Sequence, residues 1–256
     1  MKAGHFDLSG KVAIVTGGNG GIGLGMARGL AEAGAAIAIV GRNEAKSQAA
    51  VAEIERSGAR AISVVTDVTD KAAVAAMAER VARELGRIDI LVNNAGINIR
   101  KPPHALDIDE WNSVIATNLT SAFLCSQAVY PAMKAAGGGK IINIGSMMSI
   151  FGASFAPAYA ASKGGIVQFT RSCACAWAAD NIQANAVLPG WIDTDLTKRA
   201  REQIDGLHDR VLARTPAARW GGIEDFAGIA VFLASPASDF VTGTAIPVDG
   251  GYSIMG

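Results

Sequence analysis

Residues 12–23 read VAIVTGGNGGIG, and this stretch decides the class of fold. Its first part, Val12–Thr16, consists of apolar and β-branched residues and predicts a buried strand. The glycine-rich turn that follows lets the backbone approach a ligand closely, and the next segment, rich in Ala, Leu and Met, predicts a helix. Because the N-terminus of such a helix offers free N–H groups, the stretch predicts a binding site for the pyrophosphate of a dinucleotide.

The glycines of this turn match a known pattern. Gly18, Gly20 and Gly23 satisfy the general form G-x-G-x-x-G. The pattern alone is weakly specific, but a strand before it and a helix after it are the context that dinucleotide binding requires.

Short apolar segments alternate with longer helical patterns along the rest of the chain. The further predicted strands are Ala36–Val40, Ala61–Thr66, Ile88–Val92, Lys140–Ile144, Gln183–Leu188 and Thr244–Val248. The predicted helices are Gly21–Ala33, Glu44–Ser57, Lys71–Leu85, Asp109–Ala135, Ala158–Ala179 and Ile223–Ala234. Strands that are apolar throughout are typical of a parallel sheet buried on both faces. We expect an α/β fold of the doubly wound Rossmann type, a single domain over residues 1–256 with about seven parallel strands and helices on both faces.

The composition excludes several classes of function. The 256 residues include 23 basic and 23 acidic side chains, so no excess of charge points to nucleic acid or an anionic membrane. The apolar runs have the length of strands and are too short to span a bilayer. The three cysteines and three histidines are scattered, which favours neither a disulfide framework nor a metal site. We therefore expect a reduced, cytoplasmic protein that binds no metal, nucleic acid or membrane.

One charged segment, Trp191–Trp220, interrupts the alternation. Its acidic and basic residues nearly balance, which is typical of a solvated surface helix. The segment also follows the carboxyl end of a predicted strand, where ligands bind in sheets of this type. A surface helix and a lid over the substrate are the two interpretations, and residues 191–220 are our candidate lid.

Tyr159 and Lys163 are the strongest candidates for catalysis. Because they stand four residues apart on a predicted helix, they share one face. A phenol titrates at about pH 10, too high for a base at neutral pH, and a fixed cation beside it favours the phenolate. The pair therefore predicts a lowered pKa of Tyr159 and a role as general acid or base.

Three further polar elements are placed to join this pair. Ser146 follows the predicted strand Lys140–Ile144, and Asn93–Gly96, which reads NNAG, follows the predicted strand Ile88–Val92. Because the carboxyl ends of parallel strands meet at one edge of the sheet, these two elements should lie together. Asn118 stands inside an apolar helical run, where its amide competes for backbone hydrogen bonds, and it therefore predicts a polar task.

With these motifs in place, the chain resembles the short-chain dehydrogenase/reductase family over nearly its whole length. Five motifs in the family's order carry the resemblance. They are T-G-x-x-x-G-x-G at Thr16, Gly17, Gly21 and Gly23, an aspartate at Asp67, N-N-A-G at Asn93–Gly96, the tetrad Asn118, Ser146, Tyr159 and Lys163, and P-G with a downstream threonine at Pro189, Gly190 and Thr194. In this alignment Gly17, and not Gly18, is the first glycine of the pyrophosphate-binding turn.

The resemblance implies a role for each of these residues. Tyr159 would transfer the proton, Ser146 would hold the substrate oxygen, Lys163 would bind the nicotinamide ribose and tune Tyr159, and Asn118 would support a water relay. The residues implied for cofactor binding are Gly17, Asn19, Gly21, Ile22, Gly23, Arg42, Asp67, Val68, Asn94, Ala95, Gly96, Tyr159, Lys163, Pro189, Gly190, Ile192 and Thr194.

The family implies an oxidoreductase that passes a hydride between NAD(P) and a carbonyl or secondary alcohol. A homotetramer is expected by the same resemblance. An inactive dinucleotide sensor and a lyase or epimerase on the same fold are the alternatives, and neither would change the absorbance of the nicotinamide.

The sequence predicts the substrate class less narrowly than the reaction type. The segments around Arg100, Ser146–Ser149 and Arg214–Gly221 are similar to those of gluconate-type sugar-acid dehydrogenases of the family. Glucose dehydrogenases and 3-oxoacyl reductases are the other relatives, and the apolar segment Phe151–Phe155 leaves room for a lipophilic ketone or a 3-oxoacyl thioester. The predicted substrate-lining residues are Ser146, Met148, Tyr159, Trp191 and Arg100. If the substrate is an acid, we expect Arg100 to anchor its carboxylate or phosphate.

The choice of cofactor depends on the end of the second strand, where Gly41 and Arg42 follow Val40. NAD-binding proteins usually place an acid there to bind the ribose 2′-hydroxyl, whereas an arginine nearby accommodates a 2′-phosphate. Gly41 cannot repel phosphate, and the planar fork of Arg42 can bind it. We predict a preference for NADP(H), with NAD(H) as the alternative. Asn19 stands where many NADP-using relatives carry a basic residue, which makes the predicted preference modest.

Overall fold

The computed structural model describes residues 4–255 and is built around one parallel sheet of seven strands. The strands are β1 (Val12–Thr16), β2 (Ala36–Gly41), β3 (Ala61–Val65), β4 (Ile90–Asn93), β5 (Gly139–Ile144), β6 (Ile182–Pro189) and β7 (Ala245–Val248). Their order across the sheet is β3-β2-β1-β4-β5-β6-β7, and each neighbouring pair is parallel. The predicted doubly wound Rossmann-type sheet is confirmed.

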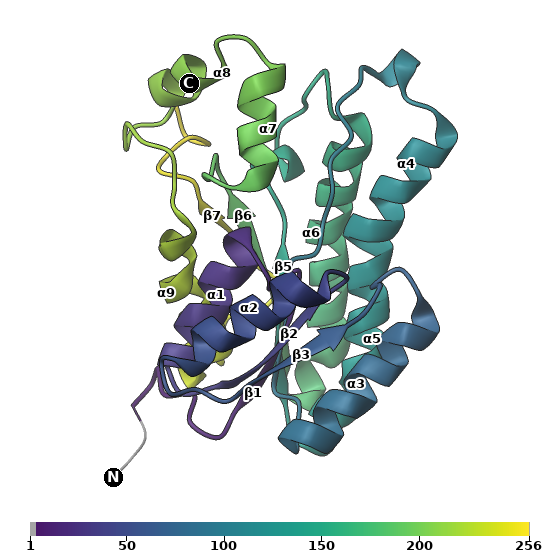
Figure 1. Cartoon of the computed structure of the whole chain (residues 1–256), viewed down its shortest axis with the longest axis vertical. Coiled ribbons are helices and arrows are strands. Elements are labelled where there is room, and N and C mark those ends of the chain that lie inside the picture. Colours follow the sequence, from purple (N-terminus) through teal and green to yellow (C-terminus); the bar gives the residue numbers. More distant parts are fainter. Residues whose placement is uncertain (1–3, 256) are drawn as a thin grey trace.

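Helices cover both faces of the sheet (Figure 1). On one face lie α1 (Gly21–Glu32), α2 (Glu44–Glu55) and α9 (Ala227–Ala234), and on the other lie α3 (Lys71–Leu85), α4 (Ile108–Ile115), α5 (Ser121–Ala135) and α6 (Pro157–Trp177). Each face has its own apolar core, because alternate residues of a strand point in opposite directions. In β1, Ala13 and Val15 enter the core beneath α1, whereas Val12 and Ile14 enter the core beneath α3 and α5.

The helix ends follow from capping residues in the sequence. Asn43 caps α2 by accepting a hydrogen bond from the Lys46 N–H, and Asp70 caps α3 by accepting from the N–H groups of Ala72 and Ala73. Gly86 ends α3 in the left-handed conformation that a residue with a side chain rarely adopts. These local signals explain why the predicted bounds of both helices lie close to the observed ones.

The predicted helix Asp109–Ala135 is interrupted. The structure has α4, then a π-helical turn, η2 (Ala116–Thr120), and then α5. A π turn inserts an extra residue into a helix and is common at functional sites. Here it contains Asn118, which is buried and aimed at the loop after β4. Sequence periodicity could not predict the turn, because the contact that requires it comes from a distant segment.

Two helices stand apart from the layers, above the carboxyl ends of the strands (Figure 1). They are α7 (Asp195–Gln203) and α8 (Leu207–Arg214), and both lie within the candidate lid at 191–220. The two ends of this segment are joined, since Ile192 and Gly221 form a β-bridge. Residues 191–220 therefore leave the sheet and return to it at adjacent points. Within residues 4–255, no helix is both long and apolar enough to cross a membrane.

Candidate active site

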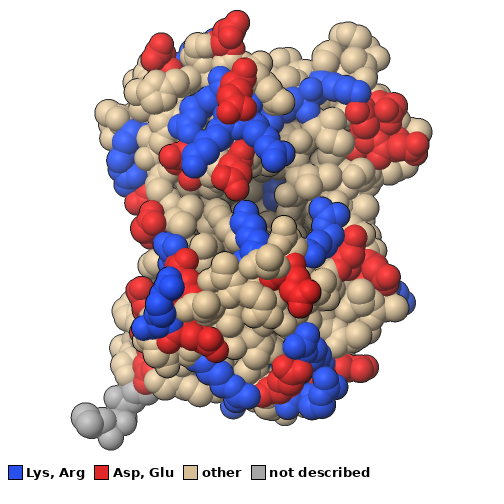
Figure 2. Space-filling model, viewed as in Figure 1, with Lys and Arg blue, Asp and Glu red and all other residues tan. Residues whose placement is uncertain are grey.

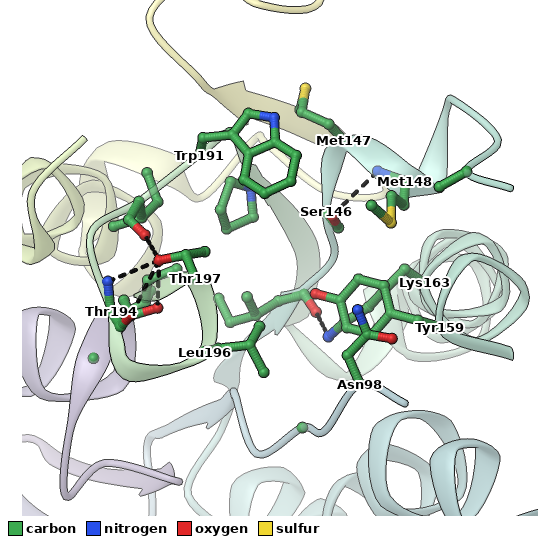
Figure 3. Close-up of a pocket in the computed structure, with 18 of the residues that line it drawn as sticks. Asn98, Ser146, Met147, Met148, Tyr159, Lys163, Trp191, Thr194, Leu196 and Thr197 are labelled. Atoms are coloured by element: carbon green, nitrogen blue, oxygen red, sulfur yellow. Dashed lines mark hydrogen bonds between the residues drawn. The ribbon is translucent and has the colours of Figure 1, made fainter. Parts of the chain in front are cut away.

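A cavity of about 1030 Å³ opens at the carboxyl edge of the sheet, under the candidate lid at 191–220. Its walls come from the loops after β1, β4, β5 and β6, together with α7 and α8. The strand order reverses direction between β1 and β4, so the loops after these strands part and leave a crevice. Figure 3 shows the part of this cavity that contains Ser146, Tyr159 and Lys163.

The glycine-rich turn forms one wall of the cavity. Gly17 and Gly21 have φ angles of 62° and 53°, which side-chain-bearing residues rarely adopt. The helix α1 begins at Gly21 with no side-chain cap and no acidic residue in its first turn. Its N–H groups are therefore available to an anion, and the positive end of the helix dipole faces the cavity. This cradle fits the pyrophosphate of a dinucleotide.

The NNAG motif holds this cradle in place. Thr16 Oγ1 accepts hydrogen bonds from the N–H groups of Asn94 and Ala95, at 3.0 and 3.1 Å. The Asn94 side chain donates to the carbonyl oxygens of Thr16 and Gly17, at 3.0 and 3.1 Å. A Cβ placed on Gly17 would lie 2.9 Å from Asn94 Nδ2, so the close approach of the two loops requires glycine there. The NNAG motif and the glycine-rich turn thus lie side by side at the carboxyl edge of the sheet.

Asn118 is only 2% exposed, and the cavity is lined without it. Its Oδ1 accepts from the Ile97 N–H at 2.8 Å, while its Nδ2 donates to the Ile97 carbonyl at 2.9 Å and to Ser162 Oγ at 3.1 Å. Ser162 in turn donates to the carbonyl oxygen of Tyr159 at 2.7 Å. Asn118 thereby ties the loop after β4 to the helix that carries Tyr159. Its place in an apolar helical run predicted a polar function for Asn118. In the structure, these hydrogen bonds position the loop and the helix.

Ser146, Tyr159 and Lys163 lie together in the cavity (Figure 3). Ser146 follows β5, and its hydroxyl accepts a hydrogen bond from the Met148 N–H at 3.1 Å. Tyr159 and Lys163 come from the first turns of α6. The Lys163 ammonium donates to the carbonyl oxygen of Ile144 at 2.6 Å and lies 5.6 Å from the centre of the Tyr159 ring. The structure therefore brings these three residues together in one cavity, and their catalytic roles stay predictions.

Burial is the main cause of the pKa shifts of Tyr159 and Lys163. It raises the pKa of Tyr159, because the phenolate loses solvation, and the Ser146 hydroxyl and the Arg100 guanidinium oppose that rise. Burial also lowers the pKa of Lys163 from 10.5 to about 8. The prediction that the pKa of Tyr159 is lowered was therefore wrong for this geometry. Lys163 is held by the Ile144 carbonyl, and Arg100 is the cation that acts on Tyr159. A protonated phenol at neutral pH is suited to donate a proton.

The residues predicted for the nicotinamide follow β6 at the same edge. Pro189, Gly190, Ile192 and Thr194 line the cavity. Thr194 is the N-cap residue of α7, and its N–H donates to Thr197 Oγ1 at 3.0 Å. The Thr197 hydroxyl in turn donates to the carbonyl oxygen of Ile192. Their backbone is thus fixed where the lid leaves the sheet.

The residues predicted for the adenosine end lie beyond the cavity at the ends of β2 and β3. Arg42 is 73% exposed, and its guanidinium lies 3.9 Å from Asp67. Asp67 accepts hydrogen bonds from the N–H and hydroxyl of Thr69, which lowers the pKa of its carboxyl. Lys46, which the sequence did not single out, lies beside Gly20, since a Cβ placed there would be 2.9 Å from its Nζ. The predicted contacts of Asn19, Ile22, Gly23, Val68 and Gly96 with the cofactor stay predictions.

The predicted substrate residues Met148, Trp191 and Arg100 line the cavity with Ser146 and Tyr159. Arg100 donates to Gln203 Oε1 at 3.0 Å and to the Leu196 carbonyl at 3.1 Å, so its guanidinium holds α7. Other polar residues of the lining were not predicted as substrate contacts, among them Asn98, Arg210 and Arg214. Asn98 lies beside Tyr159 (Figure 3), and its Oδ1 is buried without a partner among residues 4–255.

Comparison with known proteins agrees with this geometry. A family model described as enoyl-(acyl carrier protein) reductase matches residues 17–253. The chain belongs to the short-chain dehydrogenase/reductase family. It is 44% identical to a 2-dehydro-3-deoxy-D-gluconate 5-dehydrogenase of Dickeya dadantii over 253 residues, covering 98% of this chain and 99% of that protein. The predicted family and its general activity, an NAD(P)-dependent oxidoreductase of carbonyls and secondary alcohols, are confirmed.

Two further relatives differ in their substrates. A crystal structure of a gluconate 5-dehydrogenase from Burkholderia cenocepacia in complex with NADP and tartrate has a TM-score of 0.93 and 44% sequence identity, and the match covers 98% of each chain. A cis-4-hydroxycyclohexanecarboxylate dehydrogenase of Sinomonas cyclohexanicum is 42% identical over 246 residues, covering 96% of this chain and 97% of that protein.

Proposed function

We propose that the protein is an NADP-preferring dehydrogenase of a sugar acid, oxidising a secondary hydroxyl to a ketone or reducing the ketone. The observation that carries the proposal is the cavity in which Ser146, Tyr159 and Lys163 meet the glycine-rich cradle. The relatives named for gluconate and for 2-dehydro-3-deoxy-D-gluconate support this substrate class.

The residues divide the chemistry between them. Ser146 and Tyr159 hold the substrate oxygen, and Tyr159 gives its proton to the oxygen of a ketone or takes it from an alcohol. Lys163 holds the ribose of the nicotinamide, and Asn118 positions the helix of Tyr159. The bound nicotinamide supplies or accepts the hydride. The geometry at Gly17, Gly21 and the start of α1 accommodates its pyrophosphate.

NADP(H) is the preferred cofactor in this proposal, and NAD(H) is the alternative. At the end of β2, Gly41 carries no acidic side chain, Arg42 is largely exposed beside it, and Lys46 lies beside Gly20 of the glycine-rich turn. The guanidinium of Arg42 suits a 2′-phosphate. The NADP complex of the Burkholderia cenocepacia relative supports this choice.

The segment 191–220 acts as the substrate lid in this proposal. Trp191 and Leu196 line the cavity, and Arg100 holds α7 across it. Met148, Trp191 and Arg100 are the proposed substrate-contacting residues besides Ser146 and Tyr159.

A second candidate is a more apolar acid or ketone. Met147, Met148, Phe151, Phe155 and Trp191 line the cavity and would pack against a hydrocarbon ring or chain. This observation favours a cyclic hydroxy acid, a lipophilic ketone or a 3-oxoacyl thioester. The relative that acts on cis-4-hydroxycyclohexanecarboxylate supports the cyclic acid.

A homotetramer in the cytoplasm completes the proposal. Phe123 on α5 is 46% exposed and packs edge to face on Phe169 of α6, which leaves apolar surface on these two helices. A helix with apolar residues on most faces is stabilised by cover on more than one side. Light scattering that gives the mass of a monomer would contradict the tetramer, and cell fractionation tests the location.

The proposed function is tested by a substrate panel. D-gluconate, cis-4-hydroxycyclohexanecarboxylate and a neutral secondary alcohol are each assayed with NADP and NAD by absorbance at 340 nm, and a 3-oxoacyl thioester is assayed with NADPH. We expect the highest kcat/KM for the sugar acid with NADP. Oxidation of the neutral alcohol alone, or thioester reduction alone, would contradict the sugar-acid proposal.

A further inference from the structure

The cavity under the lid has an excess of positive charge. Its lining includes the basic residues Lys46, Arg100, Lys163, Arg210 and Arg214 and one acidic residue, Asp195. Asp195 already lies 3.4 Å from Lys46, at the cofactor side. Basic side chains also border the hollow below α7 in Figure 2. A cleft with one sign of charge concentrates ligands of the opposite sign, so the substrate end of this cavity favours an anion.

Arg214, at the end of α8, is held by two aromatic rings. Its guanidinium carbon lies 5.1 Å from the ring centre of Phe151 and 4.5 Å from that of Tyr252. A guanidinium stacked on rings keeps its N–H edges free to bind an oxyanion in the plane of the fork. Within the described part of the chain, Arg214 has neither an ion pair nor a hydrogen-bonded partner. The ring on one side, Phe151, is five residues from Ser146 in the sequence, so Arg214 packs on the turn that follows the catalytic serine.

A second cation stands one turn before it on the same helix. Arg210 and Arg214 are four residues apart, share one face of α8, and both line the cavity. Two like charges at this spacing disfavour the helix slightly unless an anion lies near them. Arg100 differs from both, because its guanidinium already donates to Gln203 and to the Leu196 carbonyl.

We propose that Arg214, assisted by Arg210, binds the carboxylate of the substrate. This inference rests on the proposed function and narrows its substrate class to hydroxy or keto acids whose carboxylate is remote from the reacting carbon. The carboxylate lies at the lid end, between the aromatic rings and α8, while the reacting carbon lies at Tyr159. Arg100 then holds α7 over the substrate, and the anionic end is bound by α8.

The test compares D-gluconate with D-gluconamide, which has the same carbon chain and no charge. Binding is measured by titration calorimetry on the full-length protein saturated with NADPH, so that the alcohols bind without turnover. The variants are Arg214→Gln, which keeps a polar side chain and removes the charge, and Lys198→Ala, which removes an exposed cation of α7 from outside the cavity lining. NADPH affinity checks that each variant is folded.

We expect the wild type to bind gluconate about 10- to 150-fold more tightly than gluconamide, the range for a hydrogen bond to a charged group. Arg214→Gln should abolish this difference, and Lys198→Ala should keep it. Equal wild-type affinities, absent gluconate binding, or an unchanged difference in Arg214→Gln would each overturn the role of Arg214. A wild type that binds gluconate selectively but does not reduce NADP with it would refute the proposed function and leave the carboxylate subsite standing.

Discussion

The sheet edge and the lid are built in different ways. At the edge, Thr16, Asn94, Asn118 and Lys163 are held by hydrogen bonds to the backbone or to buried side chains. The lid has a small apolar core of its own around Leu207 and stands on the sheet at two adjacent ends. The contrast indicates that the edge is preorganised for one reaction, whereas the shape and charge of the lid can vary without disturbing the edge.

The two regions also differ in what holds their charged residues. At the edge, burial lowers the pKa of Lys163, whose ammonium donates to the Ile144 carbonyl. On the lid, Arg201 stacks on Trp220 with 4.5 Å between the guanidinium carbon and the ring centre, and it pairs with Asp193. Such exposed contacts contribute little to global stability. We infer that chemistry resides in the edge and substrate choice in the lid.

The largest expected effect comes from the edge. Tyr159→Phe keeps the ring and removes the hydroxyl, so kcat should fall by about 10²- to 10⁴-fold. The affinity for NADPH, measured by fluorescence titration, should stay within about twofold, because the cradle is untouched. A variant that keeps more than a tenth of the wild-type kcat would remove Tyr159 from the mechanism.

A matched pair of leucines compares the stability of the two regions. Leu30 in α1 is 0% exposed and Leu207 in α8 is 6% exposed. Leu30→Ala should lower the free energy of unfolding by about 2–5 kcal/mol. Leu207→Ala should lower it by less than about 1 kcal/mol and raise KM, since the lid opens locally. Urea denaturation measures both variants, and equal losses would show that the lid is part of the main core.

The next prediction concerns the cofactor preference, which we assign to the end of β2. Gly41→Asp combined with Arg42→Ile should shift the ratio of kcat/KM from NADP toward NAD by about 10- to 150-fold. A Cβ at Gly41 would meet the amide of Asn19, which lies at the end of a side chain and can move. Arg60→Ile, at an exposed site before β3, is the control. An unchanged ratio in the double variant would refute the role of Arg42.

The smallest predicted effect concerns the pH dependence of stability. The pKa of Lys163 falls from 10.5 to about 8 on folding, so the unfolded chain binds more protons between these pH values. The contribution of this residue to stability should therefore rise with pH across that window, by about 1 kcal/mol per pH unit. Denaturation of the wild type and of Lys163→Met at several pH values isolates the effect. A difference that is flat between pH 8 and 10.5 would show that folding does not lower the pKa of Lys163.

Much of the edge could be predicted from the sequence, because its signals are local. The strand β1 and the glycine-rich turn are adjacent in the chain, and Tyr159 and Lys163 stand one helical turn apart. Parallel topology then places Ser146 and the NNAG motif at the same edge.

The residues that were missed depend on folding over long distances. Asn98 and Lys46 stand in segments with no motif, and their place in the cavity depends on how the loops pack. The π turn at Ala116–Thr120 depends on the contact of Asn118 with Ile97. The raised pKa of Tyr159 follows from its burial, which periodicity does not reveal.

Isotope labelling can follow the hydride directly from the nicotinamide to the substrate carbon. The wild-type enzyme is mixed with 5-keto-D-gluconate and NADPH that carries deuterium at both hydrogens of nicotinamide C4, and the product is analysed by mass spectrometry. We expect a hydroxy acid with a single deuterium on the carbon that was the ketone, formed in step with the loss of absorbance at 340 nm. A product without deuterium, or NADPH that is not consumed, would contradict it.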